Sequence, residues 1–393
     1  MKRFDERLAL VEQHVKENAV CIMIIGLGSV GTYLLDYIVS RNDSAIRIVV
    51  VGRDYEKMEM KANIVRISAL IREQNKSEIE IAAGVDLNDK KAIADCIAKY
   101  QPDFIVNSSR AYPGLKYGSI SWSNLRAYGI WSPLAIKYTR NIMDACDMAD
   151  TSAIVINTSY SDAVIPWLKS AGKAYPDFGS GNFNHLVPRI KYAVAQLLDV
   201  KDFWNVEVMF ASAHFHDVCI SKEGHNENTK QILNVYYQGK ELTLPQEKIF
   251  ELCKIPMPVD ASRNMMNASS NYRIIFAIID AIRNHREEKL FSPGVFGEIG
   301  GYPVYLGYES DVFFAKIDDR IFDMEDMRRA NRESIALDGI ENITDGKLVY
   351  TDALRDKCQK AFQVTLPKEV AYDEIDDVAS FIIENIIQPQ LEK

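Results

Sequence analysis

The sequence is poor in cysteine, and its six cysteines are scattered along 393 residues. No two of them form a CxxC pair, and no set has the spacing of a zinc site. Most lie within apolar segments, which is typical of buried free thiols. The pattern therefore predicts neither a disulfide framework nor a structural zinc site. The six are Cys21, Cys96, Cys146, Cys219, Cys253 and Cys358.

Long hydrophobic segments and an excess of positive charge are also missing. No segment approaches the roughly 18–20 apolar residues that cross a bilayer, and the first residues lack the apolar core of a signal peptide. The net charge is -9, whereas general nucleic-acid binders are normally basic. We therefore expect a cytoplasmic protein that binds neither a membrane nor nucleic acid.

The motifs of several enzyme classes are absent as well. The chain has no GxSxG nucleophile elbow, no P-loop and no HExxH metal-binding helix. Hydrolase and kinase functions therefore lack a supporting motif.

What is present is the composition of an ordinary soluble protein, with 47% hydrophobic and 26% charged residues. Over residues 19–160, β-rich apolar runs alternate with helix-like segments, which is typical of a parallel sheet covered on both faces. We therefore predict an α/β fold. It has an N-terminal helix over residues 1–18, a Rossmann-type doubly wound parallel sheet over 19–160, and a mixed α+β substrate-binding domain over 161–393.

A glycine motif, GLGSVG, follows the first apolar run at residues 26–31 and opens a helix-like segment. Gly26 permits a tight turn, Gly28 lets the backbone approach a pyrophosphate, and Gly31 lets the helix pack on the strand. The N–H groups and the dipole at the helix N-terminus then favour phosphates. The context predicts a nicotinamide dinucleotide site. Its first residues are Gly26, Gly28, Ser29, Val30 and Gly31.

The residues after the second apolar run bear on which dinucleotide binds. An NAD site normally has an Asp or Glu there, which accepts hydrogen bonds from the ribose hydroxyls. Here Gly52 and Arg53 hold that place, and an arginine suits a 2′-phosphate. Asp54 could act as the acid if the strand runs one residue longer. We therefore predict NADP as the cofactor, with NAD as the alternative.

Residues 210–217, FASAHFHD, follow a predicted strand. Here the chain resembles the lactate/malate dehydrogenase superfamily, in which a G-E-H-G-D-S-like turn follows a strand, and the resemblance covers roughly residues 20–365. The histidine of that turn donates and accepts the substrate proton, and His214 falls on it. Residues 301–307 and 338–343 resemble the family's closing G-x-P-V-x-L-G and G-I-E-x-I segments.

This resemblance implies roles for further residues. Asn157 falls on an asparagine that contacts nicotinamide and substrate, and Arg189 falls on the arginine that grips the substrate carboxylate. A guanidinium suits that role because its fork matches a carboxylate in two bonds. Ser269 and Ser270 lie where the family has a substrate-facing Ser or Thr.

One departure from that family concerns the partner of His214. The helix position that should carry its orienting Asp is Leu186. A histidine without that carboxylate loses control of its tautomer and stabilisation of its charged form. His185, Asn184 or Asp217 could take the place of the missing Asp.

A second departure concerns the mobile loop, which brings an arginine over the substrate in that family. The corresponding residues here are 108–117, SSRAYPGLKY. Arg110 or Lys116 could serve, although neither falls on the family position.

Residues 84–89 and 101–107 look more like saccharopine-type reductases. In that pattern an Asp after the third strand lies near adenine, and this role falls on Asp86. We also assign Asn107 and Ser108, which follow the next apolar run, to the cofactor site. Enzymes of that type reduce an imine formed from an amine and an oxo acid.

A metal site is an alternative interpretation of the segment around His214. His214 and His216 share one face of an extended segment, and Asp217 follows them. The sequence offers no further ligand at a suitable spacing, so we predict no metal.

These features predict an NADP-dependent oxidoreductase that moves hydride between its cofactor and a carboxylated 2-hydroxy or 2-oxo substrate. Its catalytic residues would be His214, Arg189 and His185, and it would form a homodimer or homotetramer. The alternatives are an opine- or saccharopine-type imine reductase and a catalytically inactive dinucleotide-binding protein. The segment at residues 222–262 exceeds a minimal dehydrogenase, and we expect it to build either the substrate pocket or a subunit interface.

Overall fold

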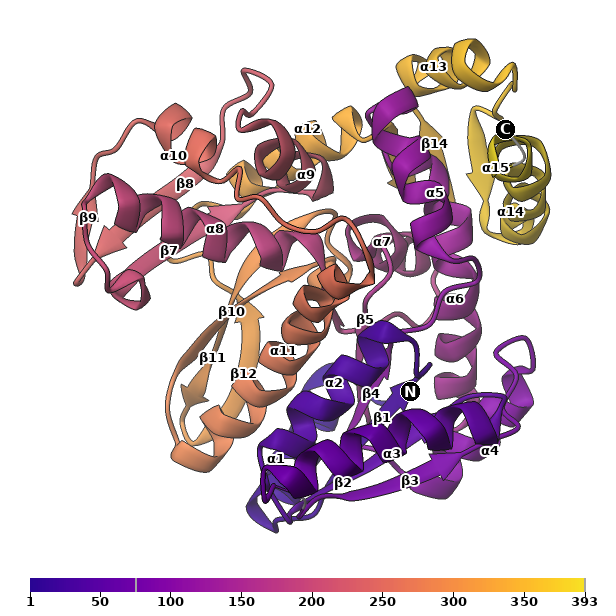
Figure 1. The fold of residues 1–393 in the computed structure, drawn as a ribbon, viewed down its shortest axis with the longest axis vertical. Coiled ribbons are helices and arrows are strands. Elements are labelled where there is room, and N and C mark those ends of the chain that lie inside the picture. Colours follow the sequence, from indigo (N-terminus) through magenta and orange to yellow (C-terminus); the bar gives the residue numbers. More distant parts are fainter. Residues whose placement is uncertain (75, 392–393) are drawn as a thin grey trace.

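The first half of the chain folds around a six-stranded parallel sheet. Its strands are β1 (Val20–Ile25), β2 (Ile46–Val51), β3 (Glu78–Ala82), β4 (Phe104–Asn107), β5 (Ile154–Asn157) and β6 (Phe178–Gly179). The computed structural model describes residues 1–74 and 76–391 (Figure 1). The sheet order is β3-β2-β1-β4-β5-β6, so the direction of winding reverses between β1 and β4. The predicted Rossmann-type sheet is confirmed, and it continues past residue 160 to include β6.

Helices cover both faces of this sheet because the side chains of β1 alternate between two apolar layers. The helices are α1 (Phe4–Lys16), α2 (Ser29–Ser40), α3 (Tyr55–Ile71), α4 (Lys90–Tyr100), α6 (Ser132–Met148) and α7 (Ser161–Ser170). Met23 and Ile25 belong to a cluster with α4, α6 and α7, whereas Ile22 and Ile24 belong to a cluster with α1, α2 and α3. This double cover explains why the strand is apolar at every position.

The second half combines helices with three small antiparallel sheets. The strands are β7 (Val206–Ala211), β8 (Ile232–Tyr237) and β9 (Lys240–Leu242); β10 (Glu288–Pro293), β11 (Gly301–Glu309) and β12 (Val312–Ile317); and β13 (Ile340–Thr344), β14 (Lys347–Tyr350) and β15 (Glu369–Ala371). The mixed α+β character expected for this half is confirmed.

The helices of the second half connect it to the parallel sheet. They are α8 (Asn182–Leu197), α9 (His214–Glu223), α10 (Gln246–Leu252), α11 (Asn264–Asn284), α12 (Met324–Leu337), α13 (Asp352–Phe362), α14 (Ile375–Ile382) and α15 (Gln388–Leu391). Helix α11 packs along α2, so the two halves form one continuous body (Figure 1). Within residues 1–74 and 76–391, no helix is both long and apolar enough to cross a membrane.

A buried ion pair fixes α1 against the sheet. The Arg7 guanidinium donates to the two carboxylate oxygens of Asp177 at 2.5 and 2.7 Å, and to the Ala153 carbonyl at 2.7 Å. Asp177 also accepts from the backbone N–H of Val155 at 2.9 Å. The pair therefore ties α1 to β5 and to the residue that precedes β6.

The chain between β4 and α6 forms what we call the covering segment, residues 110–131. It contains α5 (Gly114–Ile120), a π-helical turn at Ser121–Leu125 and a 3-10 turn at Gly129–Trp131. Because β4 ends at the carboxyl edge of the parallel sheet, the segment starts where ligands bind in doubly wound folds.

Candidate active site

Two glycines of the loop after β1 occupy positions that do not suit a side chain. Gly26 has a φ of 91°, which favours glycine. A Cβ added to Gly31 would lie only 2.2 Å from the carbonyl oxygen of Gly26. Gly28 caps α2 and has no atom within 4 Å of an added Cβ, so its backbone faces open space. The loop thus presents bare backbone at a helix N-terminus, as phosphate-binding loops do.

A hollow of about 860 Å³ extends from this loop across the ends of β1, β2 and β3. Its volume lies within the roughly 300–1,000 Å³ of ligand pockets. The Ser108 hydroxyl lies 2.6 Å from the Gly26 carbonyl and so supports the loop from β4. The predicted cofactor residues that line the hollow are Gly26, Gly28, Ser29, Val30, Gly52, Arg53, Asp54, Asp86 and Ser108.

The two candidates for recognising the ribose, Arg53 and Asp54, differ in what they already bind. Asp54 caps α3, where its carboxylate accepts from the Lys57 backbone N–H at 3.1 Å and pairs with the Lys57 Nζ at 3.0 Å. The backbone hydrogen bond from Lys57 lowers the pKa of Asp54. Arg53 is exposed and lines the hollow, and it forms no ion pair with any described residue. The guanidinium is therefore positioned to meet a ligand phosphate.

Asn107 and Asn157, both assigned above to the cofactor, require a correction. Each ends a strand, yet neither lines the hollow, because the two amides bind each other at 3.0 Å and are almost fully buried. Thr139 lies within 3.1 Å of Asn107 and 3.0 Å of Asn157. These hydrogen bonds join β4, β5 and α6 at the carboxyl edge of the sheet.

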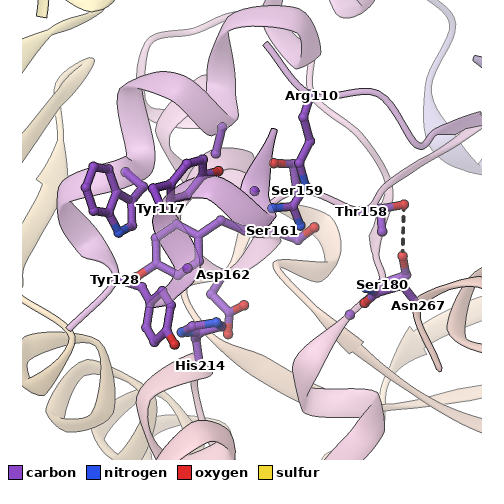
Figure 2. A pocket seen from close by; sticks show the side chains of 16 residues that line it. Arg110, Tyr117, Tyr128, Thr158, Ser159, Ser161, Asp162, Ser180, His214 and Asn267 are labelled. Atoms are coloured by element: carbon purple, nitrogen blue, oxygen red, sulfur yellow. Dashed lines mark hydrogen bonds between the residues drawn. The ribbon is translucent and has the colours of Figure 1, made fainter. Parts of the chain in front are cut away.

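A smaller cavity of about 150 Å³ adjoins the cofactor hollow and shares Arg110 and Gly114 with it. Figure 2 shows Arg110 entering this cavity from the covering segment, while His214 lies beside Tyr128 and Asp162 on the other side. His214 is the first residue of α9, directly after β7. The histidine that the sequence singled out therefore lies next to the hollow that begins at the glycine loop.

The partner of His214 is Asp338, a residue at the end of α12 that the sequence did not identify. Its Oδ2 lies 2.8 Å from the His214 Nδ1 and accepts from the Tyr160 hydroxyl at 2.6 Å. Its Oδ1 accepts from the Tyr128 backbone N–H at 2.7 Å. Asp338 is fully buried, and Leu186, where the family has its Asp, is buried in an apolar cluster. The orienting carboxylate thus comes from a different element.

The pKa values of His214 and of two nearby carboxyl groups are raised. Burial disfavours the charged imidazole, but the charge and the hydrogen bond of Asp338 outweigh it and raise the pKa of His214. Burial raises the pKa of Asp162 to about 6 and that of Asp217 to about 7, with the charge of His214 acting against burial in both. Groups that titrate near the working pH are suited to general acid–base chemistry.

Arg189 and His185 lie in a third hollow of about 300 Å³. It shares Tyr128 and Asn267 with the His214 cavity. The buried Arg189 guanidinium donates to the Cys253 carbonyl at 2.9 Å. Burial, followed by the charge of nearby arginines, lowers the pKa of His185 to about 3, so this imidazole is neutral at physiological pH.

The segment predicted to contact substrate, residues 267–271, contributes Asn267 to the His214 cavity. Ser269 and Ser270 line a separate hollow, and the Ser269 hydroxyl donates to Met265 in its own helix at 2.9 Å. Neither serine lines the His214 cavity, although Ser270, one helical turn after Asn267, donates at 3.5 Å to the carbonyl of Gly181, which does line it. Their contact with substrate stays a prediction. The Lys116 side chain lies outside the described part of the structure.

The metal alternative at His214 and His216 does not fit the contacts of His216. Its Nδ1 lies 2.8 Å from the Ser334 hydroxyl and its Nε2 lies 2.8 Å from that of Thr229, so both ring nitrogens are engaged. Burial lowers the pKa of His216 to about 4.

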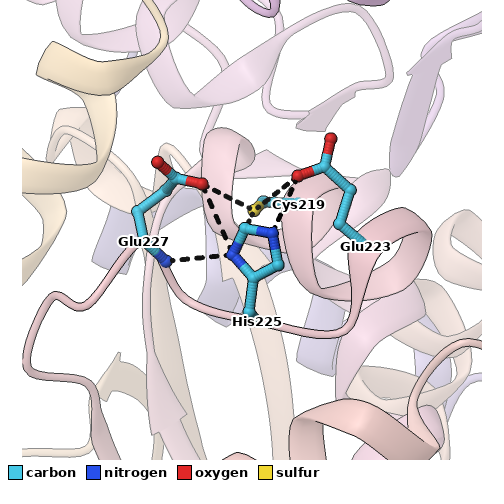
Figure 3. A group of neighbouring side chains, drawn as sticks. All are labelled: Cys219, Glu223, His225 and Glu227. Atoms are coloured by element: carbon cyan, nitrogen blue, oxygen red, sulfur yellow. Dashed lines mark hydrogen bonds and ion pairs between the residues drawn. The ribbon is translucent and has the colours of Figure 1, made fainter.

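A separate group of possible metal ligands lies at the end of α9 (Figure 3). The ligand atoms of Cys219, Glu223, His225 and Glu227 lie within 4.8 Å of one another. Arg126 contacts both carboxylates and the Cys219 sulfur. Because Arg126 pairs with both carboxylates, the group acts as an ion-pair network that ties the covering segment to the end of α9.

Comparisons with known proteins agree with this geometry. Residues 22–117 match the family described as saccharopine dehydrogenase NADP binding domain. No curated protein sequence matches the chain significantly. A malate dehydrogenase from Cryptosporidium parvum has a similar structure, with 14% identity and a TM-score of 0.50 over 81% of this chain and 98% of that one.

Two further malate dehydrogenase structures are similar but more distant. That from Plasmodium falciparum, in complex with NADH, has 14% identity and a TM-score of 0.47 over 88% of this chain and 99% of its own. That from Picrophilus torridus has 14% identity and a TM-score of 0.49 over 92% and 99%. At these identities the likeness describes the fold alone. The match of residues 22–117 to a dehydrogenase NADP-binding domain supports an NAD(P)-dependent dehydrogenase or reductase.

The replacement Asp338→Asn tests the role of the buried carboxylate. Asp338 is the largest influence that opposes burial at His214, so the pKa of His214 should fall from its native value when this charge is removed. An NMR titration of the His214 ring protons measures this shift, with the exposed Asp356→Asn as the matched control. A pKa of His214 that stays raised in Asp338→Asn would contradict the assignment.

Proposed function

We propose that this protein is an NADP-dependent oxidoreductase that interconverts a carboxylated 2-hydroxy compound and the corresponding 2-oxo compound. The observation that carries the proposal is the contiguity of two sites. His214, with its buried partner Asp338, lines a cavity that shares Arg110 and Gly114 with the hollow of the glycine loop. A proton-transferring group beside a dinucleotide site is what carbonyl reduction requires.

The residues present fit a bound dinucleotide. The bare backbone of Gly28 and the start of α2 would hold the pyrophosphate. Arg53 at the end of β2 would hold a 2′-phosphate. When bound, NADP supplies or accepts the hydride.

His214 would move the proton. Because Asp338 engages Nδ1, Nε2 is the nitrogen that exchanges a proton with the substrate oxygen. Asp338 also stabilises the charged imidazole that forms during oxidation of the alcohol. Asp162, which accepts from the His214 backbone N–H, adds negative charge on another side of the ring.

Two arginines are candidates for the substrate carboxylate. Arg110 lines the His214 cavity itself, and Arg189 lines the hollow next to it. A carboxylate held by either would orient the reacting carbon toward the shared wall of the two sites.

An imine reductase is the second candidate, because the match to the saccharopine dehydrogenase NADP-binding domain covers residues 22–117. The third interpretation is a protein without catalysis, because Leu186 holds the position of the family's orienting Asp. Asp338 supplies a carboxylate to His214 and removes that reason.

The expected homodimer would form through α3, whose outer face carries an unpartnered apolar row. Met60, Ile64, Ile67 and Ile71 are 63%, 68%, 58% and 79% exposed. These four residues follow one another at intervals of 4, 3 and 4 positions, so the row has the same spacing from either end of the helix. Two antiparallel copies of α3 would therefore place Met60 opposite Ile71, and Ile64 opposite Ile67, about one two-fold axis.

Charge on the flanks of the row agrees with this antiparallel pairing. The same axis that pairs Ile64 with Ile67 sets Glu59 opposite Arg72 of the second copy, a residue of opposite sign whose guanidinium also pairs with Asp36 of its own chain at 2.6 Å.

The replacement His214→Asn tests the reaction. We expect NADPH oxidation with 2-oxo acids to fall roughly 10²–10⁴-fold, the usual contribution of a general acid, while the Kd for NADPH stays the same. The exposed His285→Asn is the control. Turnover that requires an added amine would favour imine reduction, and unchanged turnover in His214→Asn would refute the role of this histidine.

The replacement Arg53→Ala tests the cofactor preference. Loss of a charged contact to the 2′-phosphate should raise the Kd for NADPH about tenfold or more, since 1.4 kcal/mol is tenfold, and leave the Kd for NADH unchanged. Fluorescence titration measures both constants, with Arg286→Ala as the control. Equal loss for both cofactors would contradict the phosphate contact.

The replacement Ile64→Asp tests the dimer, because it puts two charges beside the proposed axis. Sedimentation equilibrium should show a dimer for the native chain and a monomer for this variant. Val312→Asp, at a residue 63% exposed on β12, should stay dimeric. A native monomer, or a dimer that survives Ile64→Asp, would exclude this interface.

A further inference from the structure

The hollow beside the His214 cavity collects positive charge that the protein itself does not neutralise. Arg189, Lys222 and Arg263 line it. None of the three forms an ion pair with a described carboxylate within 4.0 Å. Elsewhere Arg126, Arg320 and other surface arginines pair closely with acids. Unpaired cations gathered around one hollow point to a ligand that brings the negative charge.

The titration of these groups agrees with that excess. Partial burial, followed by the charge of Arg263, lowers the pKa of Lys222. Burial lowers the pKa of Arg189, with Asp217 opposing and Arg263 adding to the effect. Arg263 thus disfavours the charged form of both neighbours, as an uncompensated cation does.

Asp217, which also lines the hollow, does not cancel this charge. It is 4% exposed, and its Oδ1 has no hydrogen-bond partner among the described residues. Because the pKa of Asp217 is near neutrality, the carboxyl group is protonated in a large share of the molecules and can then donate to an anion. A buried polar atom without a partner is rare in native proteins and indicates a missing ligand or water.

The segment that exceeds a minimal dehydrogenase, residues 222–262, forms part of the wall of the cationic hollow. Lys222 begins this segment, Val259 and Asp260 lie near its end, and Arg263 directly follows it. The same segment holds the Arg189 guanidinium through the Cys253 carbonyl at 2.9 Å and the Met257 sulfur at 3.1 Å. The Asp260 carboxylate accepts a hydrogen bond from the backbone N–H of Ser262 at 2.8 Å. It forms no ion pair with any of the three cations, all of which lie in the described part of the chain.

We propose that this hollow binds a second anionic group of the substrate, a carboxylate or a phosphate remote from the reacting carbon, and that Arg263 and Lys222 are its specificity-determining contacts. One molecule can reach both sites because Tyr128, Gly118 and Asn267 line the hollow and the His214 cavity alike. The reacting end of this molecule rests on the function proposed above. The anion site itself does not depend on that reaction.

A binding experiment tests the anion site without turnover. Isothermal titration of the full-length protein with inorganic phosphate, and separately with succinate, should show saturable binding. Arg263→Gln and Lys222→Gln should each weaken it at least tenfold, while Lys248→Gln, on α10 of the same segment, should not. The titration is repeated with NADPH bound, which fills the cofactor hollow and engages Arg53, and binding at the anion site should persist under this condition. Absence of binding in the presence of NADPH, or binding that is kept in Arg263→Gln, would overturn the proposal.

Steady-state kinetics tests the link to the substrate. Among 2-oxo acids of equal length, those that end in a carboxylate or phosphate should have kcat/KM values at least tenfold above those that end in a methyl group. Arg263→Gln should remove this difference. Equal values for all tails would overturn the proposal. If no 2-oxo acid reacts but Arg263→Gln still weakens phosphate binding, the reaction is refuted and the anion site stands.

Discussion

The arrangement of the candidate site depends on one buried charge, the carboxylate of Asp338. A buried carboxylate costs several kcal/mol unless its oxygens are hydrogen-bonded and its charge is compensated. Three contacts meet that requirement: the Tyr128 backbone, the Tyr160 hydroxyl and the His214 ring. They come from the covering segment, from the residue that precedes α7, and from α9. The carboxylate therefore fixes the positions of three segments that are far apart in the sequence.

The backbone of Asp338 also holds the end of the covering segment in place. The Gly129 N–H donates to the Asp338 carbonyl at 2.8 Å, and a Cβ on Gly129 would lie 2.5 Å from that oxygen. Arg126 anchors the preceding turn to α9 through Glu223 and Glu227. Both ends of α9 contact this segment, so a movement of the segment would also move His214.

The parts of the site that could be predicted from the sequence are those set by local geometry. The glycine loop needs only a strand, a turn and a helix in succession. Gly26 is set by its positive φ, and Gly31 excludes a side chain through the nearby Gly26 carbonyl. The partner of His214 lies 124 residues away, so no local pattern could identify it. Asn107 and Asn157 were correctly located at strand ends, but which neighbour their amides bind is decided by packing between strands. The cations of the third hollow were equally hidden, because a net charge of -9 gives no sign of a local positive site.

The pairing of His214 with Asp338 also bears on the choice between carbonyl and imine chemistry. Reduction of a carbonyl creates an alkoxide, which needs a proton at the moment the hydride arrives. Reduction of an imine starts from a nitrogen that is already protonated, so it needs no such donor. Burial opposes the charged imidazole, but Asp338 outweighs it and raises the pKa of His214, which favours the protonated, donating form. Asp338, Asp162 and Asp217 all place negative charge near the His214 ring, so a charged imidazole does not by itself exclude an iminium. The preference for carbonyl chemistry in the proposed function therefore rests on the alkoxide's need for a proton, which His214 with its Asp338 partner would supply.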